Sequence, residues 1–255
     1  MKVSALASGS SGNCFYIEHK KSAIIVDVGI SAKKIIERLA SIKRVPSNIK
    51  AIFITHEHID HVRGTDVFAR QFNIPIYATK KTIKNSFLCK EDSLIQPIKN
   101  NETVKINNLE IKAFPKSHSA ADPVSYMIST NKKVSIITDL GYLCKEANAH
   151  ISSSHFIFLE SNHDTKMLEN GPYPEHLKSW IKSDEGHLSN KQAALGILEH
   201  ANQKLRHVVL SHLSEINNTP KKAFSTFNAL LRERKNFPAE ISLSLKDYAT
   251  PIFKV

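Results

Sequence analysis

The segment "THEHIDH", residues 55–61, gathers three histidines and two acids directly after the apolar run "AIFI". In an extended segment, side chains two positions apart point to the same side, so the rings of His56 and His58 can converge. Asp60 and His61 follow at the turn into the next predicted helix. Imidazole and carboxylate groups are metal ligands, and these four at this spacing predict two metal centres, one for each pair. A lone histidine is usually only a hydrogen-bonded polar residue, but this cluster favours metal binding.

The elements that position these residues alternate between short β-rich runs and amphipathic stretches, with no linker, repeat or low-complexity tract. Strands are expected in the β-rich runs, which are "KVSALAS", "CFYIEH", "SAIIVDV", "AIFIT", "IPIYA", "LEIKAF", "SYMIST", "VSIITDL", "HFIFLES", "RHVVLSH" and two short runs at the end of the chain. Helices are expected at residues 31–42 and 60–72, after "HFIFLES", in "SNKQAALGILEHAN" with Ser189 or Asn190 as its cap, and in "PKKAFSTFNALLRER". Helices between strands in both halves predict an α+β or α/β layered domain, and the pattern alone leaves the topology open.

The size and composition of the chain predict one good-sized domain over residues 1–255, although two small ones would also fit. Three cysteines, odd in number and without a CxxC pair, argue against a disulfide framework. The N-terminal apolar stretch is too short for a signal-peptide core, and no run approaches the roughly 20 apolar residues of a membrane span. We therefore expect a soluble, cytoplasmic protein.

The formal charge is +11 and the sequence pI is near 9.5. A basic surface attracts polyanions, nucleic acid above all. Lysine greatly outnumbers arginine, so a proteome rich in lysine is an equally open explanation. The charge supports a nucleic-acid partner without proving one.

Beyond the first motif, acids and histidines follow later strands in a fixed order. They are Asp27 in "IIVDVG", His118 in "FPKSHS", Asp139 in "IITDLG" and His212 in "VVLSH". Together with "THEHIDH", this ordered set resembles that of the metallo-β-lactamase fold superfamily.

The resemblance implies a four-layer αββα sandwich with two metals in a cleft. One metal would be bound by His56, His58 and His118, the other by Asp60, His61 and His212, with Asp139 bridging and Asp27 orienting a ligand. Nitrogen-rich ligation suits zinc, while the carboxylates leave manganese open. Two metals about 3.5–4 Å apart can activate water and stabilise charge during an in-line displacement.

Two further segments resemble tRNase Z-like phosphodiesterases: "LESNHD" and the long run that begins "GHLSNKQAALGILEH". In that family a glutamate after a strand pairs with a histidine before a helix and assists the leaving group. Glu160 and His187 match those positions, which makes Asp60, Glu160 and His187 the predicted catalytic residues. A helix-capping histidine and a solvated glutamate remain the plain structural alternative.

A closer resemblance covers nearly the whole chain and is to the YycJ (WalJ) group of bacterial proteins, through "ASGSSGNC", "THEHIDH", "ESNHDTKMLENGPYP", "GHLSN" and "SHLSEINNTP". That group implies a 5′-to-3′ double-strand DNA exonuclease. The stretch between Asp139 and His212 is too short for the inserted β-CASP module of another nucleic-acid-processing branch. Ser119 departs from the group, whose members commonly carry Asp beside the third-motif histidine, so the local support of His118 is expected to differ.

Weaker signals point to substrate contacts. His163, Asn217 and Asn218 could line a phosphate path, and for His163 an accessory acid or a loop hydrogen bond is equally open. "GSSGNC" lacks the lysine of a P-loop and predicts a tight turn near the cleft. In "KKTIKNSFLCK", Lys80, Lys81 and Lys84 fall on neighbouring helical positions and could contact a nucleic-acid backbone, although a solvated face explains them as well.

The leading hypothesis is therefore a two-metal phosphodiesterase that acts on nucleic acid, specifically a DNA exonuclease. The alternatives are an RNA-processing nuclease and a hydrolase of a small thioester, lactone or cyclic nucleotide. A third class is a metal-stabilised binding protein that has lost catalysis, which the presence of all seven ligand candidates disfavours. The sequence leaves open DNA against RNA, polarity, zinc against manganese and the oligomeric state.

Overall fold

The computed structural model describes residues 1–234 and 237–255, which fall into two compact units. Unit 1 comprises Met1–Pro115, Ala120–Asn131 and Leu245–Val255. Unit 2 comprises Lys116–Ser119 and Lys132–Ser244. The single domain expected over residues 1–255 stays a prediction.

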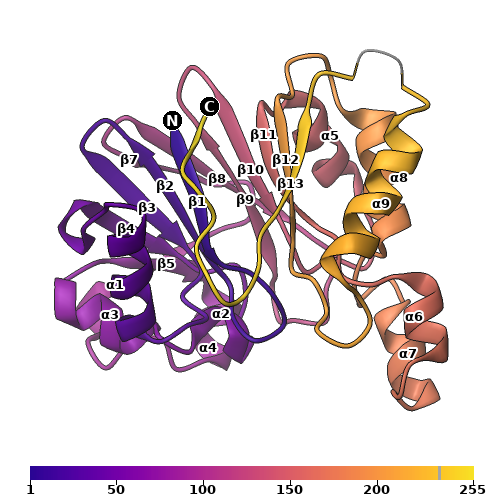
Figure 1. The fold of residues 1–255 in the computed structure, drawn as a ribbon. Coiled ribbons are helices and arrows are strands. Elements are labelled where there is room, and N and C mark those ends of the chain that lie inside the picture. The colour runs from indigo at the N-terminus through magenta and orange to yellow at the C-terminus, as the bar shows by residue number, and fades with distance from the viewer. Residues whose placement is uncertain (235–236) are drawn as a thin grey trace. The chain divides into compact units, whose positions relative to one another are not determined.

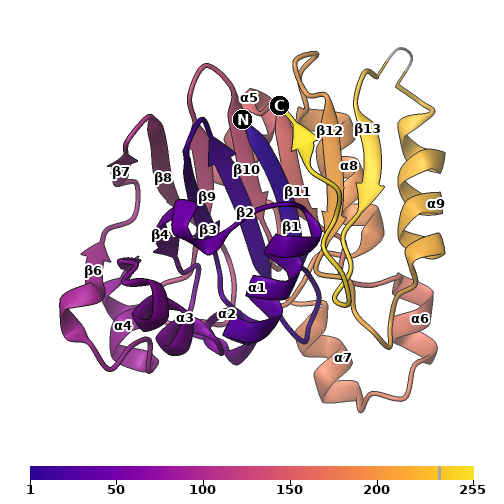
Figure 2. The same cartoon turned by 60° about the vertical axis from the view of Figure 1, so that its left-hand side comes forward.

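Unit 1 contains a seven-stranded sheet in the order β14-β1-β2-β3-β4-β5-β6. Its strands are β1 (Lys2–Ala7), β2 (Cys14–His19), β3 (Ser22–Val26), β4 (Ile49–Phe53), β5 (Ile76–Thr79), β6 (Ile95–Ile98) and β14 (Phe253–Lys254). Strands β14, β1, β2 and β3 pair antiparallel, whereas β3, β4, β5 and β6 pair parallel. The two chain ends meet in this sheet, where the amino group of Met1 donates to the carbonyl of Val255 at 3.0 Å (Figure 2).

Three more strands of unit 1 form an antiparallel ribbon. They are β7 (Thr103–Ile106), β8 (Leu109–Pro115) and β9 (Val124–Ser129). Of the strands described so far, β6 and β7 are the ones that the sequence did not predict.

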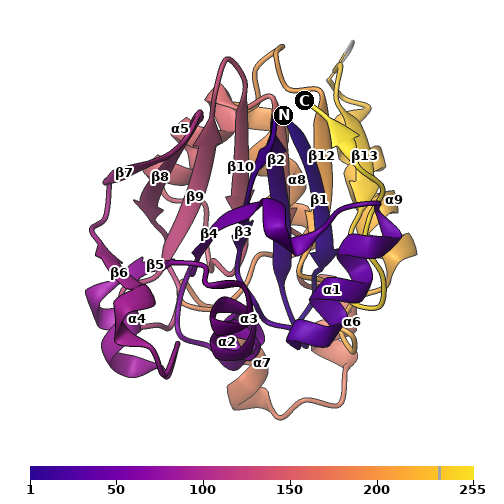
Figure 3. The same ribbon diagram turned by 90° about the vertical axis from the view of Figure 1, so that its left-hand side faces the viewer.

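The helices of unit 1 are α1 (Ala32–Ser41), α2 (Ile59–Val62), α3 (Thr65–Phe72) and α4 (Lys80–Asn85), with short 3₁₀ turns at η1 (Pro46–Asn48) and η2 (Asp92–Leu94). The predicted amphipathic helix α1 begins after its cap Ser31 and buries Ile35 and Leu39. Helix α3 buries Phe68 and Ala69 in the same apolar cluster, so both helices cover one face of the sheet (Figure 3).

The continuous helix predicted for residues 60–72 is instead divided into α2 and α3 at Gly64. The amide of Gly64 donates to the carbonyl of Val28 at 2.8 Å, and a Cβ at Gly64 would lie 2.1 Å from the carbonyl oxygen of Ile30. This close approach requires glycine and bends the chain. Periodicity alone does not report such a contact.

Unit 2 contains four parallel strands in the order β13-β12-β11-β10. They are β10 (Lys133–Ile137), β11 (Phe156–Glu160), β12 (His207–Ser211) and β13 (Glu240–Leu243). The helices are α5 (Lys145–Ser153), α6 (Thr165–Asn170), α7 (Glu175–Ile181), α8 (Asn190–His200) and α9 (Pro220–Leu231). Helix α5 was not predicted from the sequence.

Helix α8 begins at the predicted cap. Ser189 and Gln192 form a reciprocal capping box, in which each side chain accepts a hydrogen bond from the other residue's backbone amide. Helices α8 and α9 pack side by side (Figure 1). None of the helices in the described part of the chain is long and apolar enough to cross a membrane.

Candidate active site

The histidine loop, residues 55–61, connects the end of β4 to α2 in unit 1. His56 and His61 are fully buried, and His58 is the cap residue of α2. Nε2 of His56 lies 3.0 Å from Nδ1 of His58. Two nitrogen ligands of one tetrahedral zinc ion lie about 3.3 Å apart, given Zn–N bonds of about 2.0–2.1 Å. The convergence predicted for this pair is therefore present and fits a shared metal.

Asp27 follows β3 with a positive φ of 60° and is completely buried. Its Oδ2 lies 2.7 Å from Nδ1 of His61, while its Oδ1 accepts a 2.8 Å hydrogen bond from the amide of Thr55. A carboxylate on Nδ1 fixes the imidazole and directs Nε2 toward a ligand position. Nε2 of His61 lies 3.2 Å from Oδ2 of Asp60, so two predicted ligand atoms are neighbours. This is the geometry that an orienting role for Asp27 requires, and the role itself stays a prediction.

Asn13, in the turn "GSSGNC", supports the same loop and was not predicted to do so. Its amide nitrogen lies 3.2 Å from Nε2 of His61 and 3.3 Å from Oδ2 of Asp60. Its backbone amide donates to the carbonyl of Asp60 at 2.8 Å. A Cβ at Gly29 would lie 1.7 Å from that carbonyl, so the approach requires glycine. A loop asparagine carries no sequence signal that names its partner.

His118 lies in the short segment of unit 2 that follows β8. Its Nδ1 lies 3.2 Å from the carbonyl of Gly186, and only 6% of the residue is exposed. The carbonyl can accept only from a protonated Nδ1, which leaves Nε2 with a lone pair for a metal. Burial lowers the pKa of His118 to about 3, against the opposite effect of the Asp139 charge, so the ring is neutral.

Four side chains of unit 2 form a second cluster, three at the carboxyl ends of β10, β11 and β12 and the fourth, His187, in the segment between α7 and α8. Asp139, Glu160, His187 and His212 offer ligand atoms that all lie within 4.8 Å of one another. Asp139 and His212 follow β10 and β12 with φ of 58° and 55°, and Nε2 of His212 lies 3.3 Å from Oδ1 of Asp139. Parallel strands bring these residues together because their carboxyl ends lie at one edge of the sheet.

Glu160 is the centre of this cluster. Its Oε1 accepts from Nδ1 of His187 and from Nδ1 of His212, each at 2.9 Å. Its Oε2 accepts from the amides of Leu140 and Leu188 at 3.1 and 3.0 Å. Complete burial raises the pKa of the Glu160 carboxyl, but the charge and hydrogen bond of His187, with those of His212, outweigh this effect and leave the pKa lowered. Glu160 is therefore an ionised carboxylate shared by two imidazoles.

The weaker substrate-binding candidates lie near this cluster in unit 2. His163 is 2% exposed, and burial lowers its pKa to about 4. Within the described residues its Nδ1 has no hydrogen-bond partner. The same holds for Oδ1 of Asn217. Asn218 differs, because its side-chain amide nitrogen donates to the carbonyls of Ser161 and Asn162. These bonds fix the segment that follows β11.

Asn162 is a second residue that the sequence did not single out. Its amide nitrogen donates to the carbonyl of His212 at 3.0 Å and lies 3.4 Å from Nδ1 of the same residue. The backbone amide of Asn162 donates to the backbone carbonyl of Leu188. Asn162 therefore fixes the backbone turn that carries His212.

The donor set fits divalent metals. In each unit, buried histidine nitrogens and carboxylate oxygens converge, and the Nδ1 atoms of His61, His118 and His212 are occupied by chain oxygens. That arrangement leaves the opposite ring nitrogens for metal coordination. Imidazole with carboxylate suits zinc and manganese.

Comparisons with known proteins agree with this donor set. A family model described as "Beta-lactamase superfamily domain" matches residues 23–213. The chain is 36% identical to Exodeoxyribonuclease WalJ of Streptococcus pneumoniae, over 100% of this chain and 98% of the relative. It is 34% identical to Exodeoxyribonuclease YycJ of Bacillus anthracis, over 92% of this chain and 90% of that relative.

Among solved structures, the metallo-β-lactamase fold protein YhfI from Bacillus subtilis matches with a TM-score of 0.72 and 14% identity, covering 98% of each chain. The chain belongs to the β-lactamase superfamily and has the metallo-β-lactamase fold, with mixed sheets flanked by helices. The fold class expected from the sequence is confirmed, as is the resemblance to the WalJ and YycJ proteins.

Proposed function

We propose that this chain is a divalent-metal-dependent nuclease that hydrolyses phosphodiester bonds in DNA, as a 5′-to-3′ exonuclease on duplex ends. The observation that carries the proposal is the buried Glu160 carboxylate shared by His187 and His212, because it joins a predicted metal ligand to a partly exposed imidazole. The names of the two full-length relatives, both exodeoxyribonucleases, support DNA as the substrate. The formal charge of +11 suits a polyanion.

We propose two metal ions per chain, zinc or manganese. His56, His58 and His118 would hold one ion, Asp60, His61 and His212 would hold the other, and Asp139 would be a ligand of both. When bound, such ions supply Lewis-acid activation of water and stabilise charge on the phosphate. For His61, His118 and His212, a carboxylate or carbonyl oxygen lies on Nδ1, so Nε2 would be the nitrogen that coordinates.

We assign to His187 the role of proton donor to the leaving group. Departure of a sugar hydroxyl requires a proton donor, and an imidazole can donate one if it is protonated beforehand. The Glu160 carboxylate lies 2.9 Å from Nδ1 of His187 and accepts a hydrogen bond from it, so the opposite ring nitrogen is the proposed donor. The His187 side chain is 14% exposed, which leaves it open to a substrate.

The decisive experiment compares end-labelled duplex DNA, single-stranded DNA and RNA, each with zinc or with manganese. We expect stepwise release of nucleotides from the 5′ ends of duplex DNA. Digestion of RNA alone would turn the assignment to an RNA-processing nuclease. Hydrolysis of a thioester, lactone or cyclic nucleotide, without cleavage of any nucleic acid, would place the enzyme among small-molecule hydrolases. Bound metal without turnover on any of these substrates would favour a metal-stabilised binding protein.

The cytoplasmic location stays a prediction.

A further inference from the structure

The parallel strands of unit 1 bring lysines to the same edge as the histidine loop. Strands β3, β4, β5 and β6 are neighbours and run in one direction, so their carboxyl ends share an edge. Asp27 follows β3, the histidine loop follows β4, Lys80 follows β5 and Lys99 follows β6. Figure 3 shows α2, α3 and α4 gathered at this edge. Open parallel sheets bind their ligands outside the carboxyl ends of the strands.

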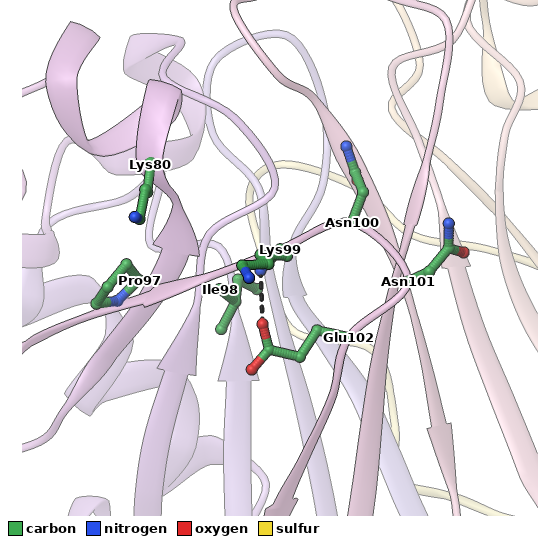
Figure 4. A pocket seen from close by; sticks show the side chains of 7 residues that line it. All are labelled: Lys80, Pro97, Ile98, Lys99, Asn100, Asn101 and Glu102. Carbon is green, nitrogen blue, oxygen red and sulfur yellow. Dashed lines mark hydrogen bonds between the residues drawn. The ribbon is translucent and has the colours of Figure 1, made fainter.

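A groove lies at the carboxyl ends of β5 and β6. It has a volume of about 610 Å³ and is lined by Lys80 from α4 and by residues 97–102, from the end of β6 and the segment after it (Figure 4). We call it the lysine groove. Lys80 and Lys99 are exposed, as are Lys81 and Lys84 on α4. In residues 1–234 and 237–255, none of these four lysines has a carboxylate within salt-bridge distance.

One acid lines the groove, and its carboxylate is engaged by the chain. Oε2 of Glu102 accepts a 2.8 Å hydrogen bond from the backbone amide of Lys99, as the dashed line in Figure 4 shows. The ammonium group of Lys99 is not part of that bond. The lysines are therefore available to an anion outside the chain.

A loop of unit 1 fixes the lysine groove to the histidine loop. The amide of Ala121 donates to the carboxylate of Glu57, between His56 and His58, at 2.7 Å. The next residue, Asp122, accepts from the Thr79 hydroxyl through its carbonyl and from the Asn100 amide through its carboxylate, at 3.1 and 2.8 Å. Residues 120–123 thus connect the ends of β4, β5 and β6.

The spacing fits a nucleic-acid strand. Neighbouring strands of a sheet lie about 4.8 Å apart, so β6 is about 10 Å from β4. One strand of a DNA duplex carries a phosphate about every 3.4 Å along its axis, so this span covers about three phosphates. A strand with one phosphate at the histidine loop would bring its following phosphates over Lys80 and Lys99.

We propose that the lysine groove holds the backbone of duplex DNA a few phosphates away from the bond that is cleaved. The inference rests on the proposed function and adds the path that the substrate takes from the metal-binding residues. Lysine ammonium groups contact phosphate without reading sequence, so the groove supplies affinity and register rather than base specificity.

The test compares two double variants with equal changes in charge. Lys80→Gln with Lys99→Gln alters the groove. Lys21→Gln with Lys50→Gln alters two exposed lysines, one just before β3 and one at the start of β4, where these strands have their amino ends. Binding to a short duplex with phosphorothioate linkages, which resist hydrolysis, is measured in the metal-loaded protein over a range of salt concentrations.

We expect the slope of log affinity against log salt to shrink by about 0.9 for each phosphate that no longer meets a lysine, so by about two in the groove variant. The control variant should keep the wild-type slope. On unmodified DNA the groove variant should raise KM and leave kcat close to wild type, with metal content unchanged. Glu102→Gln removes a negative charge while its amide oxygen can still accept from Lys99, so it should tighten binding.

Equal slopes in the two double variants would overturn the proposal and leave these lysines as a solvated face. A groove effect that appears with duplex RNA and is absent with DNA would also overturn it. If the wild-type protein cleaves DNA in either case, the proposed function survives. If the wild type neither cleaves DNA nor binds it in a salt-dependent way, the proposed function itself fails.

Discussion

Two buried histidines, His61 in unit 1 and His212 in unit 2, are held by the same device in different surroundings. Each has a buried carboxylate on Nδ1, from Asp27 at 2.7 Å and from Glu160 at 2.9 Å. The carboxylate of Asp27 is otherwise bonded to Thr55, which is also buried. The carboxylate of Glu160 is bonded to a second imidazole, that of His187, which is partly exposed.

The different surroundings of the two carboxylates separate a residue that only orients a ligand from one that can also take part in proton transfer. A carboxylate enclosed by buried partners can only fix the ring that it touches. Glu160 does the same for His212, but it also holds an accessible imidazole that can exchange protons with a substrate. Asp27 and Glu160 should therefore respond differently when their charge is removed.

The largest effect is expected from Asp139, which lies beside His212 and is the proposed bridge between the metals. Asp139→Ala should reduce metal occupancy at both sites and abolish hydrolysis, because each ion loses a ligand. Elemental analysis measures the metal content, and Asp184→Ala, at an exposed aspartate of unit 2, is the control. Full two-metal loading of Asp139→Ala would sink the bridging assignment.

Glu160→Gln should have the next largest effect because Glu160 contacts both the predicted metal ligand His212 and the proposed proton donor His187. His212 then loses the negative charge of the carboxylate that contacts its Nδ1, and metal binding should weaken about 10- to 100-fold. Loss of the partner of His187 should lower turnover by a further 10²- to 10⁴-fold, roughly the value of general-acid help. Excess metal should restore occupancy but not turnover. Circular dichroism checks folding, since the new amide would face the backbone donors of Leu140 and Leu188. Full recovery of turnover in excess metal would mean that Glu160 only orients His212.

The sequence predicted the parts of the fold that follow regular patterns. Apolar periodicity and the Ser189 cap located α1 and α8, and apolar runs located most strands. Strand β6 was missed because Pro97 breaks the pattern, yet β6 is an edge strand, where proline is tolerated.

The site was predicted less evenly. Metal-ligand candidates stand out because their residue types and spacing are unusual, and their order along the chain resembles a known family. Asn13 and Asn162 were missed because each acts on a histidine about fifty residues away, through contacts that only the folded chain creates. The double use of the Glu160 carboxylate was missed for the same reason, since pairing with His187 was expected and sharing with His212 was not.

His187→Ala isolates the second imidazole from the metals. Turnover on natural DNA should fall about 10²- to 10⁴-fold with both metals retained, because the leaving alkoxide loses its proton donor. A nitrophenyl phosphodiester should lose far less, since its phenolate departs without protonation. His176→Ala, at an exposed histidine of α7, is the matched control. Equal losses on both substrates would mean that His187 positions the phosphate or the fold, and loss of a metal would make His187 a ligand.

Asp27→Asn should have the smallest effect and tests the other side of the comparison. Asparagine keeps the shape of the side chain and an oxygen for the amide of Thr55, but it removes the charge that holds the Nδ1 proton of His61. Metal affinity should therefore fall about 10- to 100-fold, the usual cost of losing such a partner. Because the imidazole that Asp27 contacts in the described residues, that of His61, is buried, turnover should return to nearly the wild-type rate once excess metal refills the site. Titration of activity against metal concentration measures both quantities in one experiment. A rate that stays low at saturating metal would show that Asp27 affects the chemical step, and the distinction drawn between the two carboxylates would then be wrong.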